Sequence, residues 1–600
     1  MLKCVIMRVF FSSLTIIIIT MMSCKTSMKN NMSEKNLISF DSLLQNYYNE
    51  EMELYPLEAT SAGDYRFNDK LPNNLTQAYR DDLRTFYSKY QQLLRLYDRN
   101  KLDTTDRDSY DILNWECDIH LEGLQFHKEL FPVDQMWSLN LFIGQLATGR
   151  SIQPFRNIGD YENWLKRLDA FVAWCDTAIA NMKKGIETGY VLPKSLIVKV
   201  IPEITSFTTE PVTENLFYSP VKSFPETVPP SERQKLKKDY AEMIEDRLIP
   251  VFERMVKFLK NQYLPAGRET AGIGSLPDGK EWYQYLIKYY TTTSLTPDEI
   301  FEIGEQEVAR IWSEMDKVRE QTGYQGDLKS FFNFIRTDKQ LMPFTRPEQV
   351  IDHFWNIYHI IKPNMPKLFD IEPRARFEIR RTEAFREKSA SAEYNPGSFD
   401  GSRPGIFYVP IPDVKKYNIY SDEDLFLHEV IPGHHFQISL QQENKKLPQF
   451  RKILWYSGYG EGWALYSESL GKELGLYKDP YQYFGMLSND MHRAIRLVVD
   501  VGIHAKGWTR EKAVQYSLDH EAESESSIIS EVERYMANPG QALSYKIGEM
   551  KIEELKRKVF IALGPEFDIR KFHDIVLEPG CIPLDILGNK IDNWIKRYQE

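Results

Sequence analysis

Apolar residues recur at spacings of three and four along much of the chain, which is the period of an amphipathic α-helix. The pattern is clearest in the stretches 41–55, 79–100, 162–186, 237–264 and 291–312. The last stretch contains a helix start, because Thr296 stands at an N-cap position, Pro297 follows it, and Glu299 completes a capping box. The chain is therefore predicted to be mainly α-helical.

Two stretches have the character of β-strands instead, at residues 376–385 and 405–412. The turn-rich segment 394–404 lies between them and is rich in glycine, proline and serine. We expect a small antiparallel sheet beside the helical body. An exposed strand edge of this sheet would be able to take an extended peptide as an added strand.

Two segments interrupt the helical pattern, at residues 202–232 and 264–279, and both are rich in proline with threonine, serine or glycine. Neither has the low complexity of a flexible tether, and aromatic residues inside the first indicate that it packs. We interpret both as loops inside one large domain that spans residues 36–600.

The chain begins with a positively charged segment and an apolar run from Val9 to Met22, which is too short for a comfortable membrane span. Residues 1–23 are therefore predicted to be a secretory signal. The run ends in "MMSC", which resembles a bacterial lipobox and makes Cys24 the lipidated residue; the alternative is an ordinary cleaved signal with a chance cysteine. Lys25 then favours an outer-membrane anchor, and residues 24–35 form a polar tether.

The composition fits a globular protein with a large core, with 42% hydrophobic and 13% aromatic residues and a mean hydropathy of -0.46. The formal charge of -11 becomes -13 without the signal, which carries two cations and no acid. An acidic chain without a basic stripe is a poor candidate for binding nucleic acid. The cysteines beyond the signal and Cys24 are scattered, so they form neither a disulfide framework nor a CxxC metal site.

Residues 424–437, "DLFLHEVIPGHHFQ", resemble the zinc-peptidase signature His-Glu-x-x-His with an altered spacing. His428 and Glu429 stand in their usual places, but Pro432 occupies the position of the second histidine. A zinc hydrolase needs two or three His or carboxylate ligands, an open position for water and a carboxylate that takes the proton of this water. Glu429 is the candidate general base.

On an ideal helix the two later histidines could not share an ion with His428. His435 lies about 10.5 Å further along the axis, and His434 points about 120° away. Pro432 has no N–H for the carbonyl of His428, so it favours a break, and Gly433 permits one. If this region loops out like a helix bulge, His434 becomes the second ligand.

A third ligand is expected from the helical pattern at residues 456–474. Glu461 lies near its start, and Glu468 follows seven residues later on the same face. Acids flanked by tryptophan and leucine usually face a partner, so we predict Glu461 as the third ligand. The alternative is a solvated helix edge.

A second polar stripe contains Arg496, Asp500 and His504, spaced by four in an otherwise apolar helical pattern. These residues either hold one another or face the cleft. Tyr535 and Tyr545 flank a Pro-Gly turn, and either could donate to an oxyanion, although a core aromatic is the simpler interpretation of each.

The segments "HEVIPGHHFQ", "GEGWALYSE", "DGSRPGIFYV", "RLVVDVGIHAKGW" and "NPGQALSYKIG" together resemble the bacterial domain-of-unknown-function 885 family, which is grouped with gluzincin-type zinc metallopeptidases. The resemblance extends from about residue 36 to the end. It implies a mostly α-helical peptidase-like fold with a deep cleft, Zn²⁺ as cofactor, and Glu461 as third ligand. It leaves open whether His434 or His435 is the second ligand.

These observations predict a zinc-dependent peptidase that hydrolyses short peptides at the bacterial cell envelope and is held to the membrane only by lipid on Cys24. His428, His434 and Glu461 would hold zinc, Glu429 would act as base, and His504 or Tyr545 would stabilise the oxyanion. The alternatives are a non-catalytic binding lipoprotein that keeps the fold and a zinc hydrolase of a non-peptide amide or ester. Cleavage mode and oligomeric state stay open.

Overall fold

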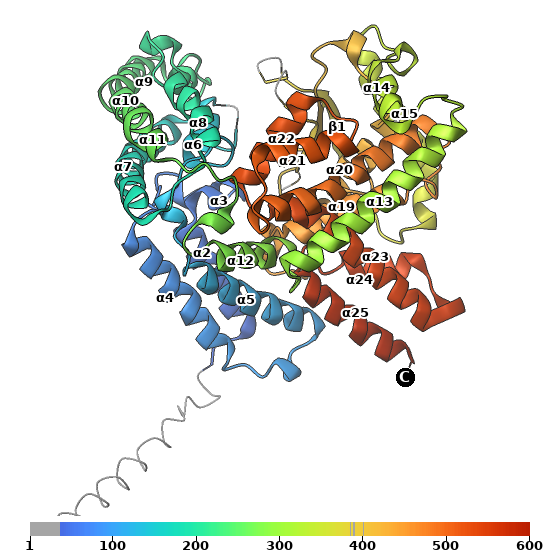
Figure 1. Cartoon of the computed structure of the whole chain (residues 1–600). Coiled ribbons are helices and arrows are strands. Elements are labelled where there is room, and N and C mark those ends of the chain that lie inside the picture. Colours follow the sequence, from blue (N-terminus) through green and yellow to red (C-terminus); the bar gives the residue numbers. More distant parts are fainter. Residues whose placement is uncertain are drawn as a thin grey trace, which may run out of the picture. The chain divides into compact units, whose positions relative to one another are not determined.

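A computed structural model describes residues 37–149, 151–383, 386–387, 390–399, 401 and 403–599 (Figure 1). The predicted signal, Cys24 and the tether lie outside these residues. Contacts divide the chain into two units, Met1–Leu43 and Leu44–Glu600. The second unit contains all the residues of the candidate site.

Helices dominate the described residues, as the apolar periodicity predicts. In the first half they are α2 (Phe40–Leu54), α3 (Pro56–Ser61), α4 (Gln77–Leu94), α5 (Thr104–Gly123), α6 (Leu139–Ala147), α7 (Ile158–Thr188), α8 (Lys194–Ser206), α9 (Pro230–Met243), α10 (Ile249–Phe258), α11 (Leu264–Ala266) and α12 (Gly279–Thr291). The π-helical turns η7 (Ile244–Leu248) and η8 (Leu259–Tyr263) join α9, α10 and α11 end to end.

The second half carries the candidate site. Its helices are α13 (Pro297–Gln321), α14 (Leu328–Thr337), α15 (Pro347–Ile361), α16 (Asp422–Glu429), α17 (His434–Glu443), α18 (Gln449–Ile453), α19 (Ser457–Ser469), α20 (Pro480–His504), α21 (Arg510–His520), α22 (Glu525–Ala537), α23 (Ser544–Leu563), α24 (Ile569–Leu577) and α25 (Leu584–Gln599). Short 3₁₀ turns are η2 (Tyr65–Phe67), η3 (Arg99–Lys101), η4 (Lys128–Leu130), η5 (Val212–Glu214), η6 (Leu216–Val221), η9 (Ile273–Ser275), η10 (Lys339–Leu341), η11 (Lys362–Lys367), η12 (Val414–Lys416), η13 (Gln541–Leu543) and η14 (Gly564–Glu566).

The start of α13 confirms the capping box. Thr296 accepts from the backbone N–H of Glu299, and the Glu299 carboxylate accepts in return from the N–H of Thr296. This exchange satisfies two of the N–H groups that a helix start leaves without partners. The helix then packs along α20, and the two lie side by side in Figure 1.

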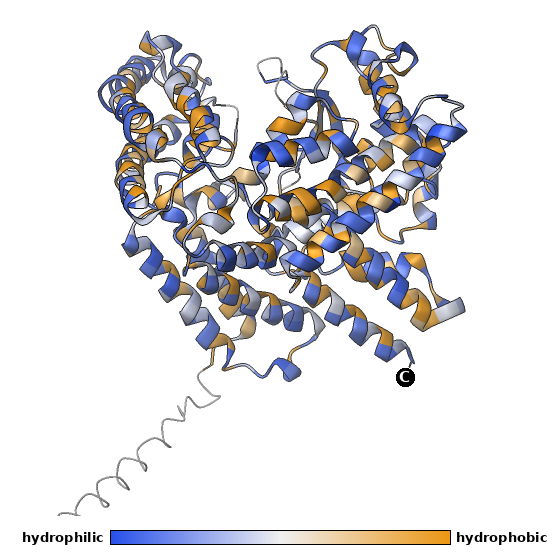
Figure 2. Ribbon diagram, in the orientation of Figure 1, coloured by the Kyte–Doolittle hydropathy of each residue, from blue (hydrophilic) through white to orange (hydrophobic). Residues whose placement is uncertain are grey.

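Apolar side chains gather into separate clusters. One contains Trp164 and Phe171 of α7 with Tyr240 of α9, and another joins Phe331 of α14 to Val498 of α20. Figure 2 shows apolar and polar residues on opposite sides of many of these helices. The second cluster builds the rigid support of the candidate site, because α20 also contacts α16.

The sheet is small and mixed. Its strands are β1 (Phe377–Arg381), β2 (Glu393–Asn395) and β3 (Gly405–Val409), in the spatial order β1-β3-β2. Phe377 pairs with Gly405 in a parallel register, whereas Tyr394 pairs with Phe407 in an antiparallel one. The predicted antiparallel pairing of the two long strands was therefore wrong: the segment between them is long enough for a crossover, and the short β2 takes the antiparallel place.

The sheet lies beside the helices of the motif, as predicted. The ring of Phe377 lies 6.3 Å from that of Phe426 in α16 and 5.1 Å from that of His435 in α17. Within the described part of the chain, no helix combines the length and the apolar character that a membrane crossing requires. The deep cleft implied by the family resemblance stays a prediction.

Candidate metal centre

The motif is divided between two helices. α16 ends at Glu429, and α17 begins at His434. The connection contains Pro432, which follows a cis peptide bond, and Gly433. The bulge predicted within one helix is thus a complete interruption.

Gly433 permits this interruption because the chain folds back onto the end of α16. A Cβ atom at this position would lie 1.9 Å from the carbonyl oxygen of His428 and 2.3 Å from that of Leu427. Both atoms belong to the backbone, so they cannot move aside cheaply. The carbonyl of Pro432 accepts from the indole N–H of Trp463 at 2.8 Å, which ties the connection to α19.

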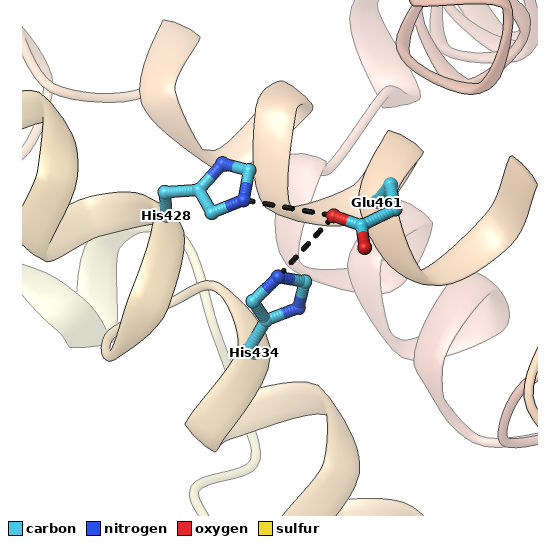
Figure 3. Close-up of side chains that lie close together, drawn as sticks. All are labelled: His428, His434 and Glu461. Atoms are coloured by element: carbon cyan, nitrogen blue, oxygen red, sulfur yellow. Dashed lines mark ion pairs between the residues drawn. The ribbon is translucent and has the colours of Figure 1, made fainter. Parts of the chain in front are cut away.

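The interruption brings three potential ligands together, His428 from the end of α16, His434 from the start of α17 and Glu461 from α19 (Figure 3). One ligand atom of each lies within 4.8 Å of the others. Glu461 Oε2 lies 3.4 Å from His434 Nε2 and 3.7 Å from His428 Nε2. His434 rather than His435 therefore joins His428.

The donor set fits a zinc ion. A tetrahedral ion with bonds of about 2.0–2.1 Å holds its ligand atoms about 3.3 Å apart, close to the two separations between Glu461 and the histidines. Burial acts to raise the pKa of Glu461, but the neighbouring His434 and His428 outweigh it and hold the pKa below its ordinary value. The site thus combines two imidazoles with an ionised carboxylate.

Close packing of α19 against α23 positions Glu461. A Cβ atom at Gly548 of α23 would lie 1.9 Å from the carbonyl oxygen of Gly458 and 2.7 Å from the Cα of Gly462. The two backbones touch at these glycines, one of which follows Glu461 directly. The third ligand therefore sits on a helix with little freedom to shift.

His435 has a different role, since its ring points toward the sheet. Nδ1 of His435 lies 2.9 Å from the Tyr394 hydroxyl of β2 and 3.4 Å from the Ser439 hydroxyl. The residue is 1% exposed, and burial lowers the pKa of its ring to about 4. His435 thus fastens α17 to β2.

Glu468 orients one of the ligands. Its Oε1 lies 2.6 Å from Nδ1 of His428, on the opposite side of the ring from Glu461. A carboxylate that accepts from Nδ1–H leaves Nε2 as the metal-binding nitrogen. The face shared by Glu461 and Glu468 was predicted from the sequence; this hydrogen bond was not.

Asp424 extends the support behind Glu468. It accepts from the Tyr477 hydroxyl at 3.0 Å and from the Asn489 amide at 2.7 Å. Burial beside Glu468 raises the pKa of Asp424 well above its ordinary value. Sequence reasoning missed this residue, although Asp424 and His428 stand four positions apart on one helix, which is a usable signal.

Glu429 lies beside the three ligands. Burial raises the pKa of its carboxyl, while His428 and His434 act in the opposite direction and Glu461 adds to the increase. These are the groups that a general base at this site would face. The two histidines and Glu461 thus act on the Glu429 carboxyl in opposite directions.

His504 is engaged elsewhere. Its Nδ1 accepts from the backbone N–H of Ile273 at 3.0 Å, and its Nε2 lies 3.0 Å from the carbonyl oxygen of Tyr535. Backbone groups thus take both ring nitrogens, and His504 has none left for an oxyanion. Burial lowers the pKa of this ring to about 3, in keeping with a neutral histidine inside the fold.

The other members of the polar stripe also bind separate elements. Asp500 accepts from the Tyr283 hydroxyl at 2.6 Å, and Arg496 donates to Glu531 at 2.8 Å. They neither hold one another nor join the ligands. The ring of Tyr545 lies 4.6 Å from the Arg496 guanidinium, and the structure does not bring it to the three ligands by any contact among the described residues.

A family model described as "Bacterial protein of unknown function (DUF885)" matches residues 56–591. The chain belongs to the DUF885 family. Comparison with solved structures relates this DUF885 chain to a "putative lipoprotein" from Colwellia psychrerythraea, with 26% identity, a TM-score of 0.84, and coverage of 93% of this chain and 99% of that one.

A second solved structure supports the fold alone. It is a "putative lipoprotein of unknown function" from Shewanella oneidensis, with 18% identity, a TM-score of 0.72, and coverage of 92% of this DUF885 chain and 99% of that one. The search among curated proteins found no match. The predicted family is thus confirmed, and the fold is shared over nearly the whole chain.

Proposed function

We propose that this DUF885 chain is a zinc-dependent hydrolase of short peptides. The observation that carries the proposal is the convergence of His428, His434 and Glu461, with ligand atoms within 4.8 Å of one another. Two imidazoles and one carboxylate are the ligand set of peptidase zinc sites that keep a position open for water or substrate.

In this proposal, the zinc ion, Glu429 and Glu468 have different roles in the reaction. A bound zinc ion would supply a Lewis acid that polarises the scissile carbonyl and makes water a better nucleophile at neutral pH. Glu429 would take the proton of the attacking water on a carboxylate oxygen and then deliver it to the leaving amine. Glu468 would hold the imidazole of His428 in the orientation that binds the metal.

Tyr545 is the remaining candidate from the sequence for stabilising an oxyanion. Its ring packs on the guanidinium of Arg496, and its hydroxyl has no hydrogen-bond partner in the described part of the chain. A phenol held by its ring, with its O–H free to donate, suits this task. We propose Tyr545 in this role in place of His504.

We also propose a location at the bacterial cell envelope, with the protein held by lipid on Cys24. The lipobox-like end of the apolar run at residues 1–23 supports this location. The descriptions of the two similar structures as putative lipoproteins support it as well.

The test uses the chain produced without residues 1–23. Metal content is measured first, in the wild type and in His434→Ala and His435→Ala variants. We expect about one zinc ion per wild-type chain, loss of most zinc in His434→Ala, and retention in His435→Ala, because His435 binds Tyr394 instead.

Activity is then measured on a library of short peptides with wild type, Glu429→Gln and Glu269→Gln. Glu269 is 81% exposed and pairs with Lys194, so it provides a matched change outside the site. We expect Glu429→Gln to keep zinc and to lose at least about 100-fold in cleavage rate, and Glu269→Gln to keep the wild-type rate.

The alternatives give different results. Equal cleavage by wild type and Glu429→Gln would reject the proposed mechanism. Zinc binding without peptide cleavage, but with turnover of amide or ester substrates that depends on Glu429, would identify a hydrolase of another substrate class. A chain without bound zinc would favour the non-catalytic binding lipoprotein.

A further inference from the structure

Trp455 presents an exposed apolar surface beside two of the ligands. Its side chain lies on the segment between α18 and α19 and is 43% exposed, although tryptophan is usually largely buried. Building on the proposed peptidase function, we infer that Trp455 forms the floor of a substrate subsite. This subsite takes an aromatic or other large apolar side chain of the peptide next to the cleaved bond.

The position of the indole ring is the first argument. Its centroid lies 5.7 Å from that of the His434 ring. A Cβ atom at Gly460 would lie 2.2–2.5 Å from three atoms of the six-membered ring of the indole, so the ring lies flat on α19 directly before Glu461. A substrate group that contacts this ring is therefore next to the reacting centre.

The second argument is that both neighbours of Trp455 in the chain are fixed. The carbonyl of Leu454 accepts from the side-chain amide of Gln441 at 3.0 Å. The N–H of Tyr456 donates to Cys581 Sγ at 3.1 Å, and its hydroxyl donates to Glu116 at 2.6 Å. An apolar surface held in this way loses little conformational entropy when it binds a ligand.

The third argument is the contrast in exposure between Trp455 and a second tryptophan, Trp463. Trp463 also lies near the motif, but it is fully buried, and its N–H donates to the Pro432 carbonyl. Trp455 leaves its outer face to solvent instead. Binding sites for small molecules are lined by such aromatic faces beside a few polar groups, and here the polar groups are the metal ligands.

The subsite is tested with a set of alanine pentapeptides. Each carries one phenylalanine, at a different position, and each is compared with the all-alanine pentapeptide. We expect the wild type to cleave one of the phenylalanine peptides with a kcat/KM about tenfold above that of the all-alanine peptide. Trp455→Ala should remove this preference, so that the two kinds of peptide are cleaved with the same kcat/KM. Trp455→Phe should keep most of the preference, and Trp137→Ala, which changes the other exposed tryptophan, should keep all of it.

Equilibrium binding separates failure of the subsite from failure of the peptidase function. The same peptides are titrated calorimetrically into zinc-loaded Glu429→Gln, with and without Trp455→Ala. Tighter binding of a phenylalanine peptide that depends on Trp455 supports the subsite even if the wild type cleaves nothing. A preference that survives Trp455→Ala, or no preference in binding and cleavage, would overturn it. If Trp455 only shields His434 from water, Trp455→Ala would lower zinc affinity and slow both peptides equally.

Discussion

At the scale of single residues, the two histidine ligands are supported unequally. Nδ1 of His428 lies 2.6 Å from Glu468, whereas Nδ1 of His434 is buried and has no hydrogen-bond partner among the described residues. The orientation of His428 is therefore set by a carboxylate. His434 depends instead on its place at the start of α17.

Removal of the Glu468 carboxylate should weaken metal binding. We expect the zinc dissociation constant to rise about 10–100-fold in Glu468→Ala, because His428 then loses the group that fixes its tautomer and orientation. Glu468→Gln should lose less, since an amide oxygen can still accept from Nδ1–H. Competition with a chelator of known affinity measures both constants, and an unchanged constant in Glu468→Ala would contradict the assigned role.

At the scale of secondary-structure elements, the connection between α16 and α17 determines the site. It places the ring of His434 4.8 Å from that of His428, between centroids, and it places His435 against Tyr394 of the sheet. This short connection thus gives two adjacent histidines different roles: His434 is a potential ligand, and His435 fastens α17 to the sheet.

Gly433→Ala should disrupt this connection. The added methyl group would lie 1.9 Å from the carbonyl oxygen of His428, so the backbone must shift. We expect a loss of about 1–3 kcal/mol in the free energy of unfolding, together with weaker zinc binding. Urea unfolding and metal content measure these effects.

Gly588→Ala is the matched control for this change. Gly588 lies within α25, where a Cβ would meet only the ends of two side chains, Leu555 and Lys551, at 4.0 Å. Alanine in a helix interior is favourable by about 0.5–1 kcal/mol, so this variant should be slightly more stable and should keep its zinc. Equal stability of the two variants would show that the close approach at Gly433 does not matter.

The sequence predicts what local periodicity and spacing encode. The helices follow from the apolar pattern. The position of Glu461 beside the two histidines follows from the presence of an acidic residue in an apolar helical pattern. The pairing direction of β1 and β3 does not, because it depends on the path of the chain between them. The engagement of His504 was equally hidden, since its partners Ile273 and Tyr535 come from elements far away in the sequence.

At the scale of the whole molecule, buried charged groups join helices that are distant in sequence. Lys546 of α23 lies 2.5 Å from Asp490 of α20 and 3.3 Å from Glu307 of α13. Asp500 of α20 is fully buried and accepts from Tyr283 of α12 and from the N–H of Gly540. The helices that support the site are therefore coupled by groups whose charge depends on pH.

Asp500 should make stability fall as pH rises. Burial raises the pKa of its carboxyl to about 7, above the value of about 3.9 in an unfolded chain. Between about pH 4 and pH 7 the folded state therefore binds a proton at Asp500 that the unfolded state has lost. This proton stabilises the fold to its full extent below about pH 4, and the stabilisation disappears as pH rises through about 7.

Comparison of wild type with Asp500→Asn isolates this contribution, because asparagine stays neutral and still accepts from Tyr283. As pH rises from 4 to 8, the free energy of unfolding of the wild type should fall by up to about 4 kcal/mol relative to that of Asp500→Asn. Urea unfolding at several pH values measures it. Parallel curves for the two proteins would show that Asp500 titrates normally.

The divided motif also affects how such proteins are found in genomes. A scan that requires two histidines four positions apart assumes one uninterrupted helix, and it passes over this chain. Here the distance between His428 and His434 is set by a Pro-Gly connection rather than by the helical repeat. A pattern that joins His-Glu to a later Pro-Gly-His and a downstream glutamate would recover such chains, and it would group sequences by how their ligands meet in space.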